Sequence, residues 1–170
     1  MTGQDRPEPS AGGPGRWVLL SYRLPREPST PRITIWRKLK RLGVAQISDG
    51  LIALPADART REHLEWTAEE ITDFGGTATV WIAHPASTEE ERRLARTMAD
   101  ARTAEYQQVL AQAEQTRALG AEERQRIVRK LRAELRRIHR RDYFPPPVRR
   151  AAEAAVAALH PANDPTEESA

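Results

Sequence analysis

The stretch Val44-Ala45-Gln46-Ile47-Ser48-Asp49-Gly50-Leu51-Ile52-Ala53-Leu54 decides the fold of this 170-residue chain. Two short, mostly apolar runs, 44–48 and 51–54, are separated by Asp49-Gly50 alone. A two-residue turn between antiparallel strands needs positive φ angles, which an Asp-Gly pair tolerates. The sequence therefore predicts a β-hairpin over residues 44–54.

A strand and a helix are predicted before this hairpin. The apolar run 17–24, closed by Pro25, is typical of a central strand. Residues 30–42 have apolar positions at helical spacing, and Gly43 follows as a helix-ending glycine. The apolar positions of this predicted helix are Ile35, Leu39 and Leu42.

After the hairpin the pattern repeats as a helix and then a strand. Residues 60–74 form a helical pattern whose inner face we expect to be Leu64, Ile71 and Phe74, and Gly75-Gly76 ends it. Residues 77–83 read as the last strand, closed by Pro85. The order β-α-β-β-α-β predicts an α+β fold of the ferredoxin-like type, with both helices on one face of an antiparallel sheet.

The rest of the chain is predicted to be helical. Thr88-Glu89-Glu90-Glu91 has the form of a capping box and starts a helix to about residue 119, and two further helices follow at 121–141 and 150–159. The expected organisation is a disordered arm (1–15), a ferredoxin-like domain (16–86), a helical extension packed on the same domain (87–159) and a disordered tail (160–170).

Composition excludes several classes of protein. The chain has no cysteine, which removes disulfides, thiolate nucleophiles and cysteine-based zinc sites and suits the cytoplasm. It has no apolar run long enough for a membrane span and no secretory signal. Its four histidines lie in separate segments, and no glycine-rich phosphate loop is present. We therefore expect no enzyme activity, no cofactor, no metal site and no membrane contact.

Positive charge is unevenly distributed although the net charge is only +3. Residues 16–54 contain eight basic and two acidic side chains, and residues 124–150 contain eleven basic and two acidic ones. Such clusters favour an anionic partner, and we expect DNA. The alternative is a solvated face that pairs with acids such as Glu89–Glu91. The candidate nucleic-acid-binding residues are Arg32, Arg37, Lys38, Lys40, Arg41, Arg129, Lys130, Arg136, Arg137, Arg140 and Arg141. Trp36, among the first group, could stack on a base or seal the core edge.

Several linked segments form a recognisable set: Trp17–Leu20 with Leu24-Pro25, then Ile35–Gly43, then Ile47–Leu51 with Leu54-Pro55, and Asp142-Tyr143-Phe144-Pro145 before an alanine-rich helix. Together these segments resemble the N-terminal domain of ChrB, the chromate-resistance regulator. The resemblance covers about residues 16–159. The first hundred residues are also similar to the Cas2-like ferredoxin domain of the phenylacetate repressor PaaX.

The resemblance implies a cytoplasmic, DNA-binding regulatory or accessory protein of chromate resistance, with chromate or another oxyanion as effector and a homodimeric state. ChrB proteins carry a C-terminal domain to which the chromate response is attributed, and we expect this chain to lack it. Cas2 nucleases hold a metal through an aspartate near the end of the first strand. Tyr22 and Arg23 occupy that region here and cannot act as hard carboxylate ligands for Mg²⁺. The alternative function is a protein-interaction (dimerisation) module that does not touch nucleic acid.

Overall fold

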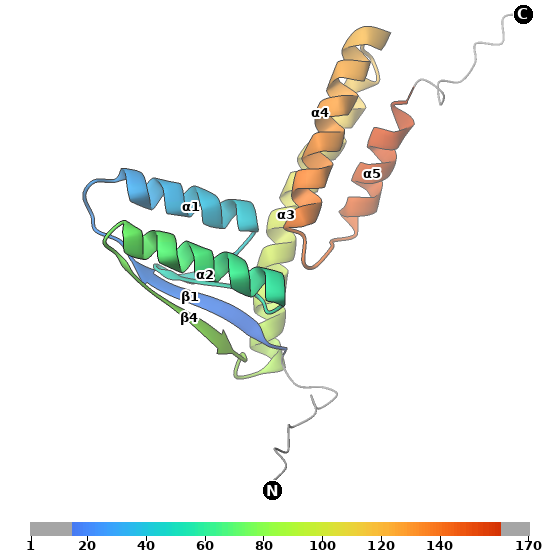
Figure 1. Cartoon of the computed structure of the whole chain (residues 1–170). Coiled ribbons are helices and arrows are strands. Elements are labelled where there is room, and N and C mark those ends of the chain that lie inside the picture. The colour runs from blue at the N-terminus through green and yellow to red at the C-terminus, as the bar shows by residue number, and fades with distance from the viewer. Residues whose placement is uncertain (1–14, 161–170) are drawn as a thin grey trace, which may run out of the picture. The chain divides into compact units, whose positions relative to one another are not determined.

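The computed structural model describes residues 15–160, and the predicted arm except Gly15 and the predicted tail except His160 lie outside that range. The chain divides into two compact units, Met1–Ala95 and Arg96–Ala170, with the division inside the long helix α3. Unit 1 is a mixed α+β structure and unit 2 is helical (Figure 1). No helix within residues 15–160 combines the length and the apolar character needed to cross a bilayer.

Unit 1 is built on a four-stranded antiparallel sheet. Its strands are β1 (Trp17–Arg23), β2 (Ala45–Ser48), β3 (Leu51–Pro55) and β4 (Thr77–Ala83), in the order β2-β3-β1-β4. β1 is therefore central, as its apolar run predicted, and β2 and β4 are the two edges. Leu19 pairs with Ala53 on one side and with Trp81 on the other.

The predicted hairpin is present, with Ser48 paired to Leu51 across the two-residue turn, but the φ angles of the turn differ from those predicted. Only Gly50 has a positive φ, at 72°, and Asp49 does not. A bulge in β2 between Gln46 and Ser48 absorbs the difference in register. A Cβ atom on Gly50 would clash with the carbonyl oxygen of Tyr22, so both the backbone angle and the close approach require glycine.

Two helices lie on one face of this sheet, α1 (Thr30–Leu42) and α2 (Ala58–Asp73) (Figure 1). Val18 and Leu20 of β1 are fully buried on the helix side, together with Ile35, Leu39, Leu64 and Ile71 of the helices. α2 starts earlier than predicted because Asp57 caps it: the Asp57 carboxylate accepts from the Thr60 amide at 2.7 Å. Phe74 ends the helix and is 38% exposed, so its predicted place in the inner face was wrong.

The first turns of a third helix lie at one end of the opposite face of the sheet. α3 (Thr88–Thr116) begins there, one residue after Ser87, whose hydroxyl accepts from the amide of Glu90 at 3.2 Å. The predicted cap at Thr88 therefore shifts by one residue. The Glu91 carboxylate accepts from the indole of Trp17 at 3.1 Å and from the Gly15 amide at 2.7 Å. Glu91, one of the acids proposed as a partner for the basic helices, is thus occupied within unit 1.

Unit 2 contains the rest of α3 together with α4 (Ala121–Arg140) and α5 (Val148–Ala158). Their apolar sides share one core, to which α3 contributes Tyr106, Val109 and Ala113. From α4 and α5 the core takes Val128, Leu131, Leu135, Ile138, Ala152, Ala155, Val156 and Leu159. The three- and four-residue steps of the apolar side chains along α4 thus form a packed seam, as the sequence predicted.

Candidate nucleic-acid interface

α4 has two contrasting faces. Val128, Leu131, Leu135 and Ile138 are buried, and four arginines lie on another side of the same helix: Arg129, Arg132, Arg136 and Arg140. At about 100° per residue these four side chains fall within about 80° of arc, and the middle of that arc is about 125° from the middle of the buried side. We call these four residues the arginine stripe.

All four residues of the arginine stripe are exposed, and none forms an ion pair or hydrogen bond with another residue of the described range. Their steps of three, four and four residues keep them in one line along the helix. The line covers about 16 Å at 1.5 Å per residue. The sequence-based prediction included Arg129, Arg136 and Arg140 and missed Arg132, which the same helical spacing could have identified.

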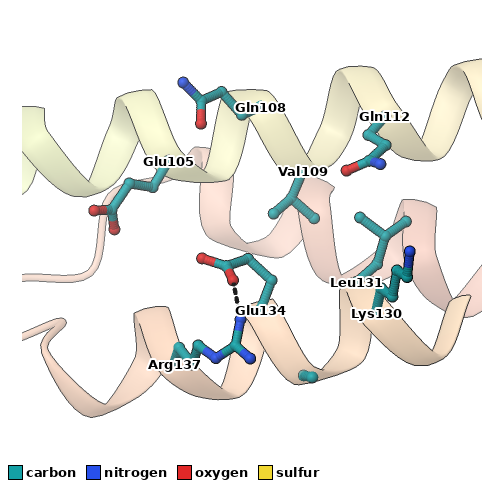
Figure 2. A pocket seen from close by; sticks show the side chains of 9 residues that line it. Glu105, Gln108, Val109, Gln112, Lys130, Leu131, Glu134 and Arg137 are labelled. Atoms are coloured by element: carbon teal, nitrogen blue, oxygen red, sulfur yellow. Dashed lines mark hydrogen bonds and ion pairs between the residues drawn. The ribbon is translucent and has the colours of Figure 1, made fainter. Parts of the chain in front are cut away.

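The remaining predicted cations of α4 lie elsewhere on the helix. Lys130 and Arg137 of α4 line a groove of about 540 Å³ between α3 and α4, to which α3 contributes Glu105, Val109 and Gln112 among others (Figure 2). The Arg137 guanidinium donates to Glu134 at 2.8 Å. This groove carries both signs of charge over an apolar floor of Val109 and Leu131, so Lys130 and Arg137 do not extend the arginine stripe.

Arg141 is a structural residue and not a surface cation. Its side chain is 16% exposed and donates to Glu105 at 2.9 Å, while its carbonyl accepts from Arg102 at 3.3 Å. Arg102 also pairs with Glu105, at 2.9 Å. Arg141, which the sequence suggested as a nucleic-acid-binding residue, is therefore engaged in an internal ion pair. It is the C-cap residue that follows α4, and its side chain turns back to bind Glu105 of α3.

A buried polar cluster fixes the turn between α4 and α5. The Tyr106 hydroxyl donates to Asp142 Oδ2 at 2.8 Å, and the Asp142 side chain is completely buried. Burial, followed by this hydrogen bond, raises the pKa of Tyr106 well above its ordinary value. On α5, Arg149 lies 3.6 Å from Asp142 and donates to Glu153 at 2.9 Å. The bond to Glu153 is the main cause that raises the pKa of Arg149.

The predicted cations of α1 are spread around their helix. At 100° per residue Arg32, Arg37, Lys38, Lys40 and Arg41 cover about 240° of arc. Two of them already have partners: Lys38 binds Glu70 of α2 at 2.6 Å, and Lys40 lies 5.3 Å from the ring centre of Trp36. Arg37 and Arg41 are exposed and one turn apart. α1 therefore offers a pair of adjacent arginines and no continuous line.

The end of β1 carries no carboxylate. Tyr22 and Arg23 stand there, and burial together with Asp49 raises the pKa of the Tyr22 hydroxyl, while Arg32 opposes the shift. Across residues 15–160, no three histidine or acidic side chains are grouped so that they could hold a metal ion.

The described residues thus combine an α+β sheet unit with an arginine-rich helical unit. The family described as "Protein ChrB, N-terminal" matches residues 32–168, which include parts of both units. The chain belongs to this family, as the resemblance of its segments predicted. Membership implies an association with chromate resistance. No curated protein and no solved structure shows a significant match to the chain.

Proposed function

We propose that this protein is a DNA-binding regulatory or accessory protein of chromate resistance that contacts the duplex backbone through the arginine stripe of α4. It acts by binding and not by catalysis. The observation that carries the proposal is the alignment of four exposed arginines without acidic partners in the described range. That the protein responds to an oxyanion effector remains a prediction, and it rests on family membership alone.

The stripe suits a phosphate backbone for electrostatic reasons. Each arginine that neutralises a phosphate releases condensed counterions, and this gain adds to affinity. A guanidinium also donates two parallel hydrogen bonds to a phosphate. Successive stripe residues are about 5 to 6 Å apart along the helix axis, close enough for neighbouring phosphates to be contacted together. The buried side of α4 fixes the orientation of the stripe, so binding requires little ordering of the helix.

We also propose that the sheet of unit 1 is of the ferredoxin-like type. Support comes from the element order β-α-β-β-α-β and from the central position of β1 and β3 in an antiparallel sheet. Both α1 and α2 lie on one face, as that type of fold requires (Figure 1).

A matched pair of double variants tests the DNA-binding proposal. Arg136→Glu with Arg140→Glu changes two stripe residues one turn apart, and Arg37→Glu with Arg41→Glu makes the same change one turn apart on α1. Affinity is measured by fluorescence anisotropy on a duplex containing the DNA upstream of the gene. We expect the α4 pair to weaken binding by about 100-fold or more, and the α1 pair by about fivefold or less. Equal losses, or no wild-type binding at low salt, would refute the proposal.

The second candidate function is a dimerisation module without nucleic-acid binding. It is favoured by the exposed edge strand β4, where Ile82 is 48% exposed. Sedimentation of the wild type and of Ile82→Lys distinguishes the two candidates. A dimer that this substitution dissociates, in a protein that binds no duplex, would give the second candidate first place.

A further inference from the structure

The open face of the sheet in unit 1 presents an exposed tryptophan in a fixed orientation. Trp81 of β4 is 53% exposed, and its indole Nε1 donates to the hydroxyl of Ser21 on β1 at 3.0 Å. The Ser21 hydroxyl in turn lies 3.5 Å from the Thr79 carbonyl, to which it donates. The ring therefore reaches from the edge strand towards the central one, and its only polar group is occupied. What it offers to solvent is an aromatic face.

The side chains around Trp81 are hydroxyl-bearing or cationic. Thr79 and Thr77, which precede Trp81 in β4, lie on the same face of the sheet as Trp81. Their partners on β1, Ser21 and Arg23, lie on that face as well. Arg23 is exposed and has no ion-pair partner within residues 15–160. None of the four strands contains an acidic residue.

A cavity of about 180 Å³ adjoins this surface. Leu19, which pairs with Trp81 across the strands, and Ala83, two residues further along β4, form part of its wall. Trp17, Ile47, Pro85 and Leu94 complete its apolar lining, and its polar lining residues are His84, Glu90 and Arg93. The cavity lies on the same face of the sheet as Trp81, so a chain of planar groups could place one ring on the tryptophan and the next in the cavity.

We propose that this face binds single-stranded nucleic acid, with an unpaired base stacked on Trp81 and a neighbouring base in the cavity beside it. Stacking on aromatic side chains is the usual mode of single-strand recognition and tolerates any base, because every base has a π face. The hydroxyls of Thr77 and Thr79 and the guanidinium of Arg23 supply donors for the sugar-phosphate chain. This site goes beyond the proposed function: it lies in the other unit, and its ligand is a single strand.

A protein partner is the other occupant that an exposed tryptophan attracts. An aliphatic partner surface would desolvate the hydroxyls of Thr77 and Thr79 and the guanidinium of Arg23 without replacing their hydrogen bonds to water, which costs free energy. A nucleic-acid strand satisfies the same groups with phosphate and sugar oxygens. The chemistry of the surface therefore favours nucleic acid, and self-association through this face is an outcome that the test must detect.

The second exposed tryptophan provides a matched control. Trp66 of α2 is 52% exposed, and its neighbours include Glu62, Glu65 and Glu69, which repel phosphate. We expect Trp81→Ala to weaken binding of a labelled oligothymidylate by about 10- to 100-fold, since stacking contributes roughly 1–3 kcal/mol per base. Trp66→Ala should leave the affinity unchanged within about twofold, and Trp81→Phe should retain most of it.

Two further measurements on the same preparations test the single-strand site and do not depend on the stability of Trp81→Ala. Wild-type protein should bind an abasic oligonucleotide of equal length about 10-fold more weakly or worse, because the phosphates remain and the stacking bases are gone. Duplex affinity should not change in Trp81→Phe, which separates this site from the arginine stripe. Equal binding of the abasic strand would overturn the proposal. So would equal losses in Trp81→Ala and Trp66→Ala, or dissociation of a wild-type dimer by Trp81→Ala.

Discussion

Helices α1 and α4 are both rich in basic residues, and they differ in how those residues are arranged. On α1 the five predicted cations are spread over most of the helix circumference, and Lys38 and Lys40 are engaged with Glu70 and Trp36. On α4 four arginines form one line on the side away from the core. A count of charges treats the two helices alike. Spacing and partners show that only α4 offers a continuous cationic surface.

The largest expected effect is a difference in stability between variants of two neighbouring arginines at the C-terminal end of α4, Arg140 and its C-cap residue Arg141. Arg141→Glu should lower the free energy of unfolding by about 2 kcal/mol or more, because it removes a mostly buried partner of Glu105 and places two carboxylates together. Arg140→Glu should change stability by less than about 0.5 kcal/mol, since its side chain is exposed. Urea unfolding followed by circular dichroism measures both. Similar stability of the two variants would show that the contact of Arg141 with Glu105 stabilises the fold no more than the exposed side chains of the arginine stripe do.

A smaller effect is expected at the support of α4. Tyr106→Phe removes the donor to the buried Asp142 carboxylate and should cost about 1–3 kcal/mol at neutral pH. The folded state raises the pKa of Tyr106, so the stabilisation is complete below the ordinary tyrosine pKa of about 10 and is lost as the pH rises above it. The difference between wild type and variant should therefore shrink in alkaline solution. A difference that is absent at neutral pH would contradict this account.

The smallest effect concerns the cation of α1 that the structure has already paired. Lys38 and Glu70 are each about one-third exposed, so their 2.6 Å contact should couple α1 to α2 by about 0.5 kcal/mol. A double-mutant cycle with Lys38→Gln and Glu70→Gln measures this coupling. Arg37→Gln is the control and should show no coupling with Glu70→Gln. A coupling energy of zero between Lys38 and Glu70 would mean that Lys38 remains available to bind nucleic acid.

The sequence predicted the secondary structure well because its signals are local. Asp49-Gly50 located the hairpin, Gly43 ended α1, and the apolar seam of α4 was visible in the spacing of its side chains. The errors occur at the ends of elements. Phe74 is exposed because α2 ends at it, and Ser87 caps α3 in place of Thr88, one residue later. Composition and periodicity do not locate a cap or a helix end to within one residue.

The candidate site was predicted less completely, for two different reasons. Arg132 has the same helical spacing as Arg129, Arg136 and Arg140, so the sequence contained the signal. The partners of Lys38 and Arg141 could not be found in this way, because Glu70 and Glu105 are 32 and 36 residues away along the chain. Only the folded structure shows which positive charges are already neutralised.

The salt dependence of duplex binding tests the arginine stripe most directly. The slope of log affinity against log salt should decrease in magnitude by about 0.9 when any one stripe residue is changed to glutamine, because one phosphate contact is lost. Arg132→Gln is the sharpest case, since it was identified from geometry alone, and Arg37→Gln is its control. The account predicts the decrease for Arg132→Gln and an unchanged slope for Arg37→Gln. An unchanged slope for Arg132→Gln, or equal decreases for both, would contradict it.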